Sequence, residues 1–229
     1  MRQQERQNRI QRALDQLPEI QARKDKNDKK KGKAPSEARA STTDPDARIM
    51  KGPAGSHRPS YNGQLATDAP SQIIVGAAVT QSGADQGEMV PMVEQIYQAY
   101  GKAPEDYLVD GGYLKFDDIQ TVSSEPYNST IYMPLQPASA GNPHPEAPNA
   151  SDTLHVAAWR ERMQTDEAKA LYKLRGATAE CVNAIARNRG LQQFRVRGLT
   201  KVGIVLTWYA LAHNVMRAHH LRAACILAV

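Results

Sequence analysis

β-prone runs and a helical segment alternate between Tyr61 and Leu135, and this alternation constrains the fold more than any other feature of the chain. Two short runs, Tyr61–Asp68 and Gln72–Thr80, flank an Ala-Pro-Ser turn, which is typical of a β-hairpin. The segment Glu88–Tyr100 then places its apolar side chains at helical spacing, and the glycine after it is a normal stop signal. This order of elements predicts layers of strands and helices rather than an all-α bundle.

The remainder of the chain continues the same mixture. A short apolar run, 107–109, ends at Asp110 and a pair of glycines, which predicts a buried strand with Asp110 at its C-terminal edge. A second strand is expected over Thr130–Leu135, followed by an irregular, proline-rich insertion. Helical spacing then predicts one helix over Trp159–Arg187 and another over Leu199–Arg222. The expected fold class is therefore α/β with a helical C-terminus.

The first 40 residues differ in composition from the rest. Apolar residues recur at helical spacing over Glu5–Ile20, which predicts a short amphipathic helix that weakens near Pro18. Residues 22–40 combine charge, Gly and Pro with no large apolar side chain, so they cannot bury enough surface to offset the entropy of ordering. Residues 1–40 are therefore predicted to form a basic helix followed by a disordered linker.

No segment of the sequence suggests a membrane anchor. The longest apolar stretch without charge, Val202–Ala212, is much shorter than the roughly 20 residues that a bilayer-spanning helix needs. The first residues alternate basic and polar side chains and lack the apolar region of a secretory signal. We therefore expect a cytoplasmic protein that does not bind membranes.

Charge is segregated along the chain. Residues 1–40 contain 12 Lys and Arg against 6 Asp and Glu, residues 41–180 contain 10 against 18, and residues 181–229 contain 7 against none. Clustered cations attract a polyanion such as DNA through counterion release. The acidic central block is where metal-binding carboxylates are expected. On charge alone, the alternative remains open that the basic ends are merely solvated.

Several ordered blocks resemble one known family. The series TTDPDARIMK, RPSYNGQLATD, QIIVGAAVT and YLVDGGY resembles the catalytic region of bacterial DDE-type insertion-sequence transposases, which are related to ribonuclease-H-like nucleases. Tyr172, Arg175, Glu180 and Arg187 resemble the Tyr-Arg-Glu-Lys signature of one large transposase group. Here four residues separate Arg175 from Glu180 where the family has three, and Arg187 stands in the Lys position. The family is also resembled by the basic C-terminal segment RNRGLQQFRVRGLTKVGIVLTWYALAHNVMR. Together the matches cover residues 41–217.

The resemblance implies a fold, a site and a chemistry. The fold would be an incomplete ribonuclease-H-like mixed sheet with flanking helices, in a catalytic domain over 41–217 with a tail over 218–229. Asp110 would be the second metal-binding carboxylate and Glu180 the third, with Mg²⁺ as the cofactor. The DNA-binding residues would be Tyr172, Arg175, Arg187, Arg195, Arg197 and Lys201. The partner would be the DNA ends of the mobile element, and the protein would be bacterial, nucleoid-associated and a homo-oligomer.

The first carboxylate of the family has no clear counterpart. In the family it lies in an Asp-Gly-Thr-like strand before the hairpin, and no such strand is recognisable before Tyr61. Asp44 and Asp46 are expected to act as turn or cap residues, and Asp68 matches the second strand of the family instead. The resemblance therefore implies a truncated transposase that lacks its first ligand and is inactive in metal-dependent DNA cleavage.

Two other functions remain open. One is a non-enzymatic remnant that binds DNA or a full-length transposase subunit through the basic ends and the two amphipathic helices. The other is a nuclease of the ribonuclease-H-like fold.

Overall fold

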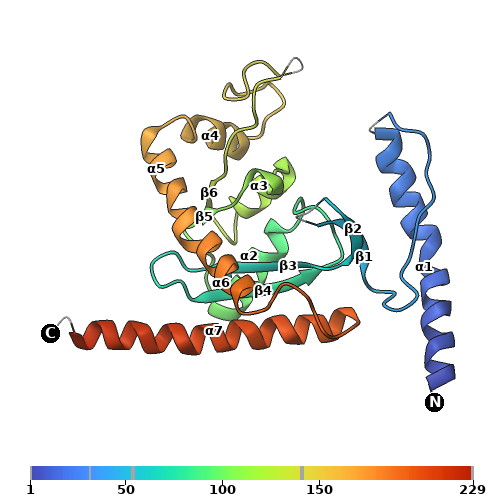
Figure 1. Ribbon diagram of the computed structural model, residues 1–229. Coiled ribbons are helices and arrows are strands. Elements are labelled where there is room, and N and C mark those ends of the chain that lie inside the picture. Colours follow the sequence, from blue (N-terminus) through green and yellow to red (C-terminus); the bar gives the residue numbers. More distant parts are fainter. Residues whose placement is uncertain (1, 31, 53–54, 140–141, 228–229) are drawn as a thin grey trace. The chain divides into compact units, whose positions relative to one another are not determined.

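The computed structural model describes residues 2–30, 32–52, 55–139 and 142–227, and the chain divides into two compact units. Unit 1 comprises Met1–Gly63, Val79–Gly83 and Gln193–Thr207. Unit 2 comprises Gln64–Ala78, Ala84–Gln192 and Trp208–Val229. Figure 1 shows the elements of both units along the chain.

Unit 1 begins with α1 (Arg2–Lys30), which contains the helix predicted over Glu5–Ile20 and accommodates Pro18 within it. The prediction that the linker starts at residue 22 is wrong, because the helix continues to Lys30. Hydrogen bonds explain the difference. The Gln21 side chain donates to Asp25 one turn later and accepts from the backbone N–H of Ala38. The segment after α1 is therefore folded back along the helix that it was expected merely to follow.

A short hairpin that the sequence did not reveal follows in unit 1. Strand β1 (Arg48–Lys51) pairs antiparallel with β2 (His57–Ser60), and Arg48 lies opposite Ser60. A hydrogen bond from the Gly52 N–H to the Ser56 carbonyl closes the turn. Both strands lack fully buried positions, so they show none of the apolar alternation by which strands are recognised.

The predicted hairpin over Tyr61–Thr80 is confirmed as β3 (Asn62–Thr67) and β4 (Ile74–Thr80), which form a two-stranded sheet. The last helix, α7 (Leu199–Leu227), is also confirmed but is longer than predicted. The separate tail predicted over 218–229 is wrong for the described residues, because the helix continues through them to Leu227. No Gly or Pro occurs after Arg217 to end it.

The main core of unit 2 surrounds a parallel strand pair. Strand β5 (Asp106–Leu108) pairs with β6 (Thr130–Tyr132), and Tyr107 lies opposite Ile131. The predicted helix α2 (Met89–Tyr100) ends at Gly101 in the left-handed conformation, as expected for a helix stop. A further helix, α3 (Phe116–Val122), was not predicted and lies against α2, α4 (Leu154–Arg162) and β6 (Figure 1). The core side chains are Met89, Val93, Val109, Leu114, Ile119, Val122, Ile131, Met133, Val156, Trp159, Met163 and Ala168.

The helix predicted over Trp159–Arg187 is several helices. Helix α4 ends at Arg162, and α5 (Asp166–Arg175) begins after Thr165, whose hydroxyl accepts from the Ala168 N–H as an N-cap. A five-residue π-helix, η2 (Gly176–Glu180), then joins α5 to α6 (Cys181–Asn188). Apolar periodicity does not distinguish one long helix from several short ones, whereas the cap at Thr165 does.

The proline-rich insertion is fastened to α4 by a buried ion pair. The Arg160 Nε and Asp152 Oδ2 atoms lie 2.7 Å apart, and each side chain is only 4% exposed. The Asp152 carboxylate also accepts from the Asn149 N–H, and the Arg160 guanidinium lies 5.3 Å from the centre of the Phe116 ring. Burial alone would raise the pKa of Asp152, but the Asn149 N–H and the Arg160 guanidinium outweigh it and lower that pKa.

The expected mixed α/β class with a helical C-terminus is confirmed. The described strands form three two-stranded sheets, however, instead of the single mixed sheet that was predicted. A ribonuclease-H-like topology stays a prediction. None of the described helices is both long and apolar enough to span a membrane.

Candidate functional site

Asp110 follows β5 directly and adopts an extended backbone conformation. Its Oδ1 atom accepts from the Gly112 N–H at 2.7 Å and so caps the 3₁₀ turn η1 (Gly111–Tyr113). Its Oδ2 atom lies 4.0 Å from Nη1 of Arg175. The carboxylate therefore forms the local turn expected of an Asp-Gly-Gly sequence and also faces a distant cation of unit 2.

Arg175 brings the two predicted carboxylates together. Its Nη2 atom lies 2.7 Å from Glu180 Oε1, while Nη1 faces Asp110. The guanidinium also lies 5.6 Å from the centre of the Tyr172 ring. The Asp110 and Glu180 side chains are 44% and 59% exposed, so both are accessible to ions in solution. The residue that follows β5 thus meets the junction of α5 and η2 at one guanidinium.

The π-helix explains the unusual spacing of the signature. In an α-helix, positions five residues apart lie roughly 140° apart around the axis and cannot form a close pair. A π-helical turn holds one additional residue, which allows Arg175 and Glu180 to lie on one side of the helix. The fourth intervening residue, which departs from the family pattern, is therefore accommodated where the helix changes from α to π.

Three further residues surround Asp110 and were missed by the sequence analysis. The Tyr113 hydroxyl donates to Gln64 Oε1, and Gln64 Nε2 donates to Asp85 Oδ1 at 2.7 Å. The pKa of Tyr113 is raised because burial disfavours the phenolate and because the carboxylates of Asp85 and Asp110 lie nearby. No spacing in the sequence connects Gln64, Asp85 and Tyr113, although Tyr113 belongs to the YLVDGGY block that carries the resemblance.

Gly112 is required by the crowding of these carboxylates. A Cβ atom at position 112 would lie 2.8 Å from Asp110 Oδ1 and 3.5 Å from Asp85 Oδ2. Any larger residue would therefore displace the Asp110 carboxylate from its cap. The second glycine of the Asp-Gly-Gly sequence leaves space for two acidic side chains beside the same backbone.

The predicted DNA-binding residues fall into two groups. Tyr172, Arg175 and Arg187 belong to unit 2, and Arg187 is exposed on α6. Arg195, Arg197 and Lys201 belong to unit 1 and are exposed at and before the start of α7. Within each unit these cations are available to phosphate, except that Arg175 is held by the two carboxylates.

The three acidic residues considered for the first carboxylate, Asp44, Asp46 and Asp68, have structural partners. Asp44 accepts from the Tyr61 hydroxyl and from the Gly198 N–H, and Asp46 accepts from the Leu199 N–H. Both carboxylates therefore cap the N-terminus of α7, where unpaired N–H groups favour negative charge. Asp68 accepts from the N–H and hydroxyl of Ser71 inside the β3–β4 turn. The sequence predicted turn or cap roles for Asp44 and Asp46 around Pro45; both carboxylates are caps, but of a helix that is distant in sequence.

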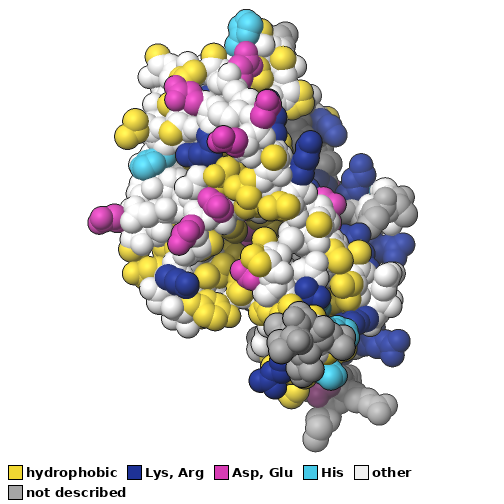
Figure 2. Space-filling view, turned by 90° about the vertical axis from the view of Figure 1, so that its left-hand side faces the viewer, with side chains coloured by type: hydrophobic (Ala, Val, Ile, Leu, Met, Phe, Trp, Pro, Cys, Tyr) yellow, Lys and Arg dark blue, Asp and Glu magenta, His cyan; other side chains and the backbone are white. Residues whose placement is uncertain are grey.

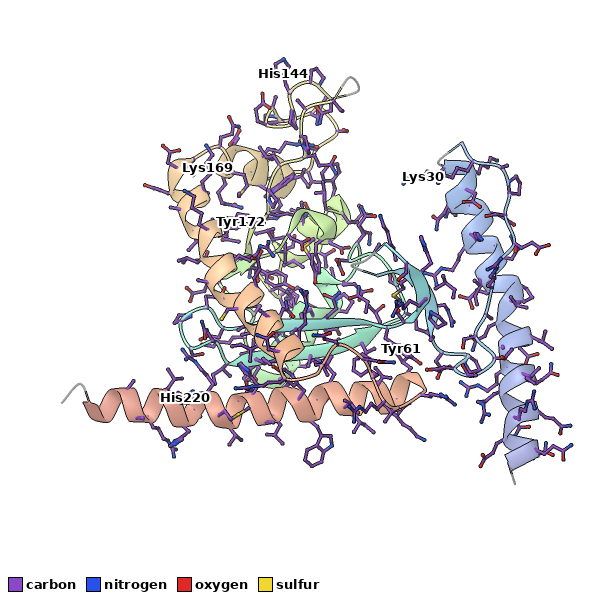
Figure 3. The ribbon with its side chains drawn as sticks, in the orientation of Figure 1. Lys30, Tyr61, His144, Lys169, Tyr172 and His220 are labelled. Carbon is purple, nitrogen blue, oxygen red and sulfur yellow. The ribbon has the colours of Figure 1, made fainter. Side chains whose placement is uncertain are left out.

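A shallow groove adjoins Tyr172. It encloses about 630 Å³ and combines apolar walls with the amines of Lys169 and Lys173. Figure 3 shows Lys169 and Tyr172 on the same helix, α5. Figure 2 looks onto the side that carries α4 and α5 and shows apolar side chains in a hollow there. The remaining lining residues are Pro134, Leu135, Met163, Asp166 and Ala170.

The donor chemistry suits one hard divalent cation. Carboxylate oxygens are the ligands that Mg²⁺ prefers, and Asp110 and Glu180 already converge on one positive group. Among the described residues, no group of three or more His, Cys, Asp or Glu side chains is arranged to hold a metal ion. Asp110 and Glu180 are the two carboxylates near Arg175 that could supply oxygens to such an ion.

Comparison with known proteins identifies part of the chain. Residues 147–219 match the family model described as a transposase DDE domain, and this range contains Tyr172, Arg175, Glu180 and Arg187. No curated protein and no solved structure matches the chain. The resemblance noted in the sequence is confirmed over this range, and residues 147–219 are similar to a transposase DDE domain.

Proposed function

We propose that the chain is part of an insertion-sequence transposase that binds the DNA ends of its element and a divalent metal ion. The observation that carries the proposal is the convergence of Asp110 and Glu180 on Arg175. Arg175 and Glu180 lie in the range that matches the family model, and Asp110 follows β5. DDE-type transposases use divalent metal ions in DNA cleavage and strand transfer. In this proposal Mg²⁺ is the cofactor, and the topology is ribonuclease-H-like.

Each residue of the site has a physical task in this function. Asp110 and Glu180 would hold the ion through their negative oxygens, and a bound ion would supply stabilisation of charge on a phosphate oxygen. Arg175 neutralises the two carboxylates in the absence of an ion and pairs with DNA phosphate when it is released, because its planar fork fits two phosphate oxygens. The Tyr172 ring lies 5.6 Å from the guanidinium and attracts its positive charge. Arg187, Arg195, Arg197 and Lys201 supply further phosphate contacts.

DNA affinity should depend steeply on salt. Replacing Arg195, Arg197 and Lys201 together by Gln should weaken binding to duplex DNA and make the slope of log K against log salt shallower by about 2 to 3, since each lost phosphate contact removes about 0.9 from the slope. Fluorescence anisotropy across a salt series measures this. Lys102→Gln, which removes an exposed cation of unit 2, should leave the slope unchanged. Equal slopes for wild type and the triple variant would contradict the proposed contacts.

Cleavage in the same reactions separates the enzymatic alternatives. We propose that this chain binds DNA without cutting it, because two carboxylates hold one ion whereas in-line displacement in this family uses two. Cutting followed by joining of the 3′-hydroxyl to target DNA would show an active transposase. Cutting without joining would favour the ribonuclease-H-like nuclease.

A second function, as a subunit-binding remnant and homo-oligomer, is favoured by the exposed face of α7. Trp208, Leu211 and Val215 recur at helical spacing and are 67%, 55% and 63% exposed. No charged residue occurs between Lys201 and Arg217, so nothing on this stretch repels a second copy of the helix. Burying such side chains would stabilise a pair of helices.

Sedimentation velocity tests this second function. The wild-type chain should show concentration-dependent association, and Leu211→Glu should abolish it by placing a charge in the apolar face. Leu154→Glu is the matched control, because Leu154 is an 81% exposed apolar residue on another helix of unit 2. A wild-type chain that remains monomeric at every concentration would remove this function.

A further inference from the structure

The π-helix η2 is held by one of its own side chains and by one side chain from outside it. A change from α to π alters the backbone hydrogen-bond pattern, and carbonyl groups near the change need other donors. The Thr178 hydroxyl donates to the Leu174 carbonyl at 2.9 Å. The Gln72 side-chain amide, which belongs to the β3–β4 turn, donates to the Ala177 carbonyl at 3.0 Å. Gln72 is therefore the long-range anchor of this segment.

Gln72 is itself held in an unusual conformation. Its φ angle is 57°, in the left-handed region that non-glycine residues seldom adopt. Its N–H donates to the Asp68 carbonyl at 2.8 Å, and its carbonyl lies 2.9 Å from His213 Nε2 on α7. Strain of this kind persists only where the surroundings enforce it. Here the backbone is held from both sides, which directs the side chain at Ala177.

Helix α7 clamps the rest of the same turn. The Asn214 side chain accepts from the Ile74 N–H and donates to the Ile74 carbonyl, both at 2.8 Å. The Arg217 Nε atom donates to the Ser71 carbonyl at 2.6 Å. The turn is thus fixed within unit 2, and its Gln72 side chain reaches the helix that carries Glu180.

We propose that Gln72 is a positioning residue for Glu180: by binding the Ala177 carbonyl it maintains the π-helix that places Glu180 beside Arg175 and Asp110. Without this hydrogen bond the segment relaxes toward α-helical geometry, in which Arg175 and Glu180 lie on different sides of the helix. Glu180 then turns away from the site. This inference rests on the proposed function of Asp110 and Glu180 as metal ligands.

The test uses Mn²⁺ alone as the probe on the full chain. Gln72→Met retains the length of the side chain but removes the donor, and should weaken Mn²⁺ binding about 10-fold, the lower end of the effect of residues that orient metal ligands. It should also speed amide hydrogen exchange over residues 176–182. Gln95→Met is the matched control, because the Gln95 side chain also binds a backbone carbonyl, that of Ala77, away from the π-helix. It should leave Mn²⁺ affinity and exchange over 176–182 unchanged.

Rescue separates positioning from general stability. Deleting Ala177 closes the gap between Arg175 and Glu180 to three residues and should convert the π-helix to an α-helix, so that Mn²⁺ binding survives and no longer depends on Gln72. The inference is overturned if Glu180→Gln weakens Mn²⁺ binding but Gln72→Met does not. Proposed function and inference fall together if Glu180→Gln has no effect, and unchanged amide exchange in Gln72→Met removes the positioning role independently of any metal.

Discussion

Replacing Arg160 by Met is expected to lower the free energy of unfolding of unit 2 by about 3–5 kcal/mol, because it leaves the Asp152 carboxylate buried without its cation. Chemical denaturation measures the change. Replacing both partners, with Arg160→Met and Asp152→Leu, should restore much of the loss, since a buried pair replaced by apolar side chains costs little. Lys169→Met removes a solvent-exposed pair with Asp166 and should change stability by less than about 1 kcal/mol.

The same ion pair should make stability depend on pH. The folded-state pKa of Asp152 is lowered, so its contribution is fully present above the unfolded pKa of about 3.9 and is lost as pH falls through the folded pKa. The difference between wild type and Arg160→Met should therefore shrink below about pH 4. A difference that is constant from neutral to strongly acidic pH would show that Arg160 stabilises the unit by packing on Phe116 and Trp159 instead.

Elements with regular periodicity could be predicted, and those defined by long-range partners could not. The β3–β4 hairpin, α2 and α7 each bury one face, so their apolar spacing reveals them. The strands β1 and β2 bury no complete face, and α3 is a helix of only seven residues. Extension of α1 to Lys30 depends on contacts such as that between Gln21 and Ala38, which no local pattern reveals.

The candidate site was predictable only in part for a related reason. Asp110 and Glu180 could be selected because ordered motifs surround them, and the structure brings both to Arg175. The role of Gln64 and Asp85 could not be predicted, since the fold, and not their spacing in the sequence, brings them close to Asp110. The extra residue between Arg175 and Glu180 departed from the motif in sequence, whereas the π-helix accommodates it in three dimensions.

Removing either carboxylate should have the largest effect on ion binding. Asp110→Asn and Glu180→Gln preserve shape but lose the negative charge that a divalent cation requires, so each should weaken Mn²⁺ affinity by about 100-fold or more, beyond the effect of residues that only orient ligands. Asp166→Asn is the control, because Asp166 is a fully exposed carboxylate on the neighbouring helix α5. Its substitution should leave affinity unchanged.

The most direct measurement of the central claim is a titration of the full chain with Mn²⁺, followed by electron paramagnetic resonance, for the wild type and these three variants. If Asp110 and Glu180 share an ion, the wild type and Asp166→Asn bind Mn²⁺ alike, while Asp110→Asn and Glu180→Gln both lose that binding. Equal Mn²⁺ binding by all four proteins, or none by the wild type, would contradict the assignment of Asp110 and Glu180 as metal ligands.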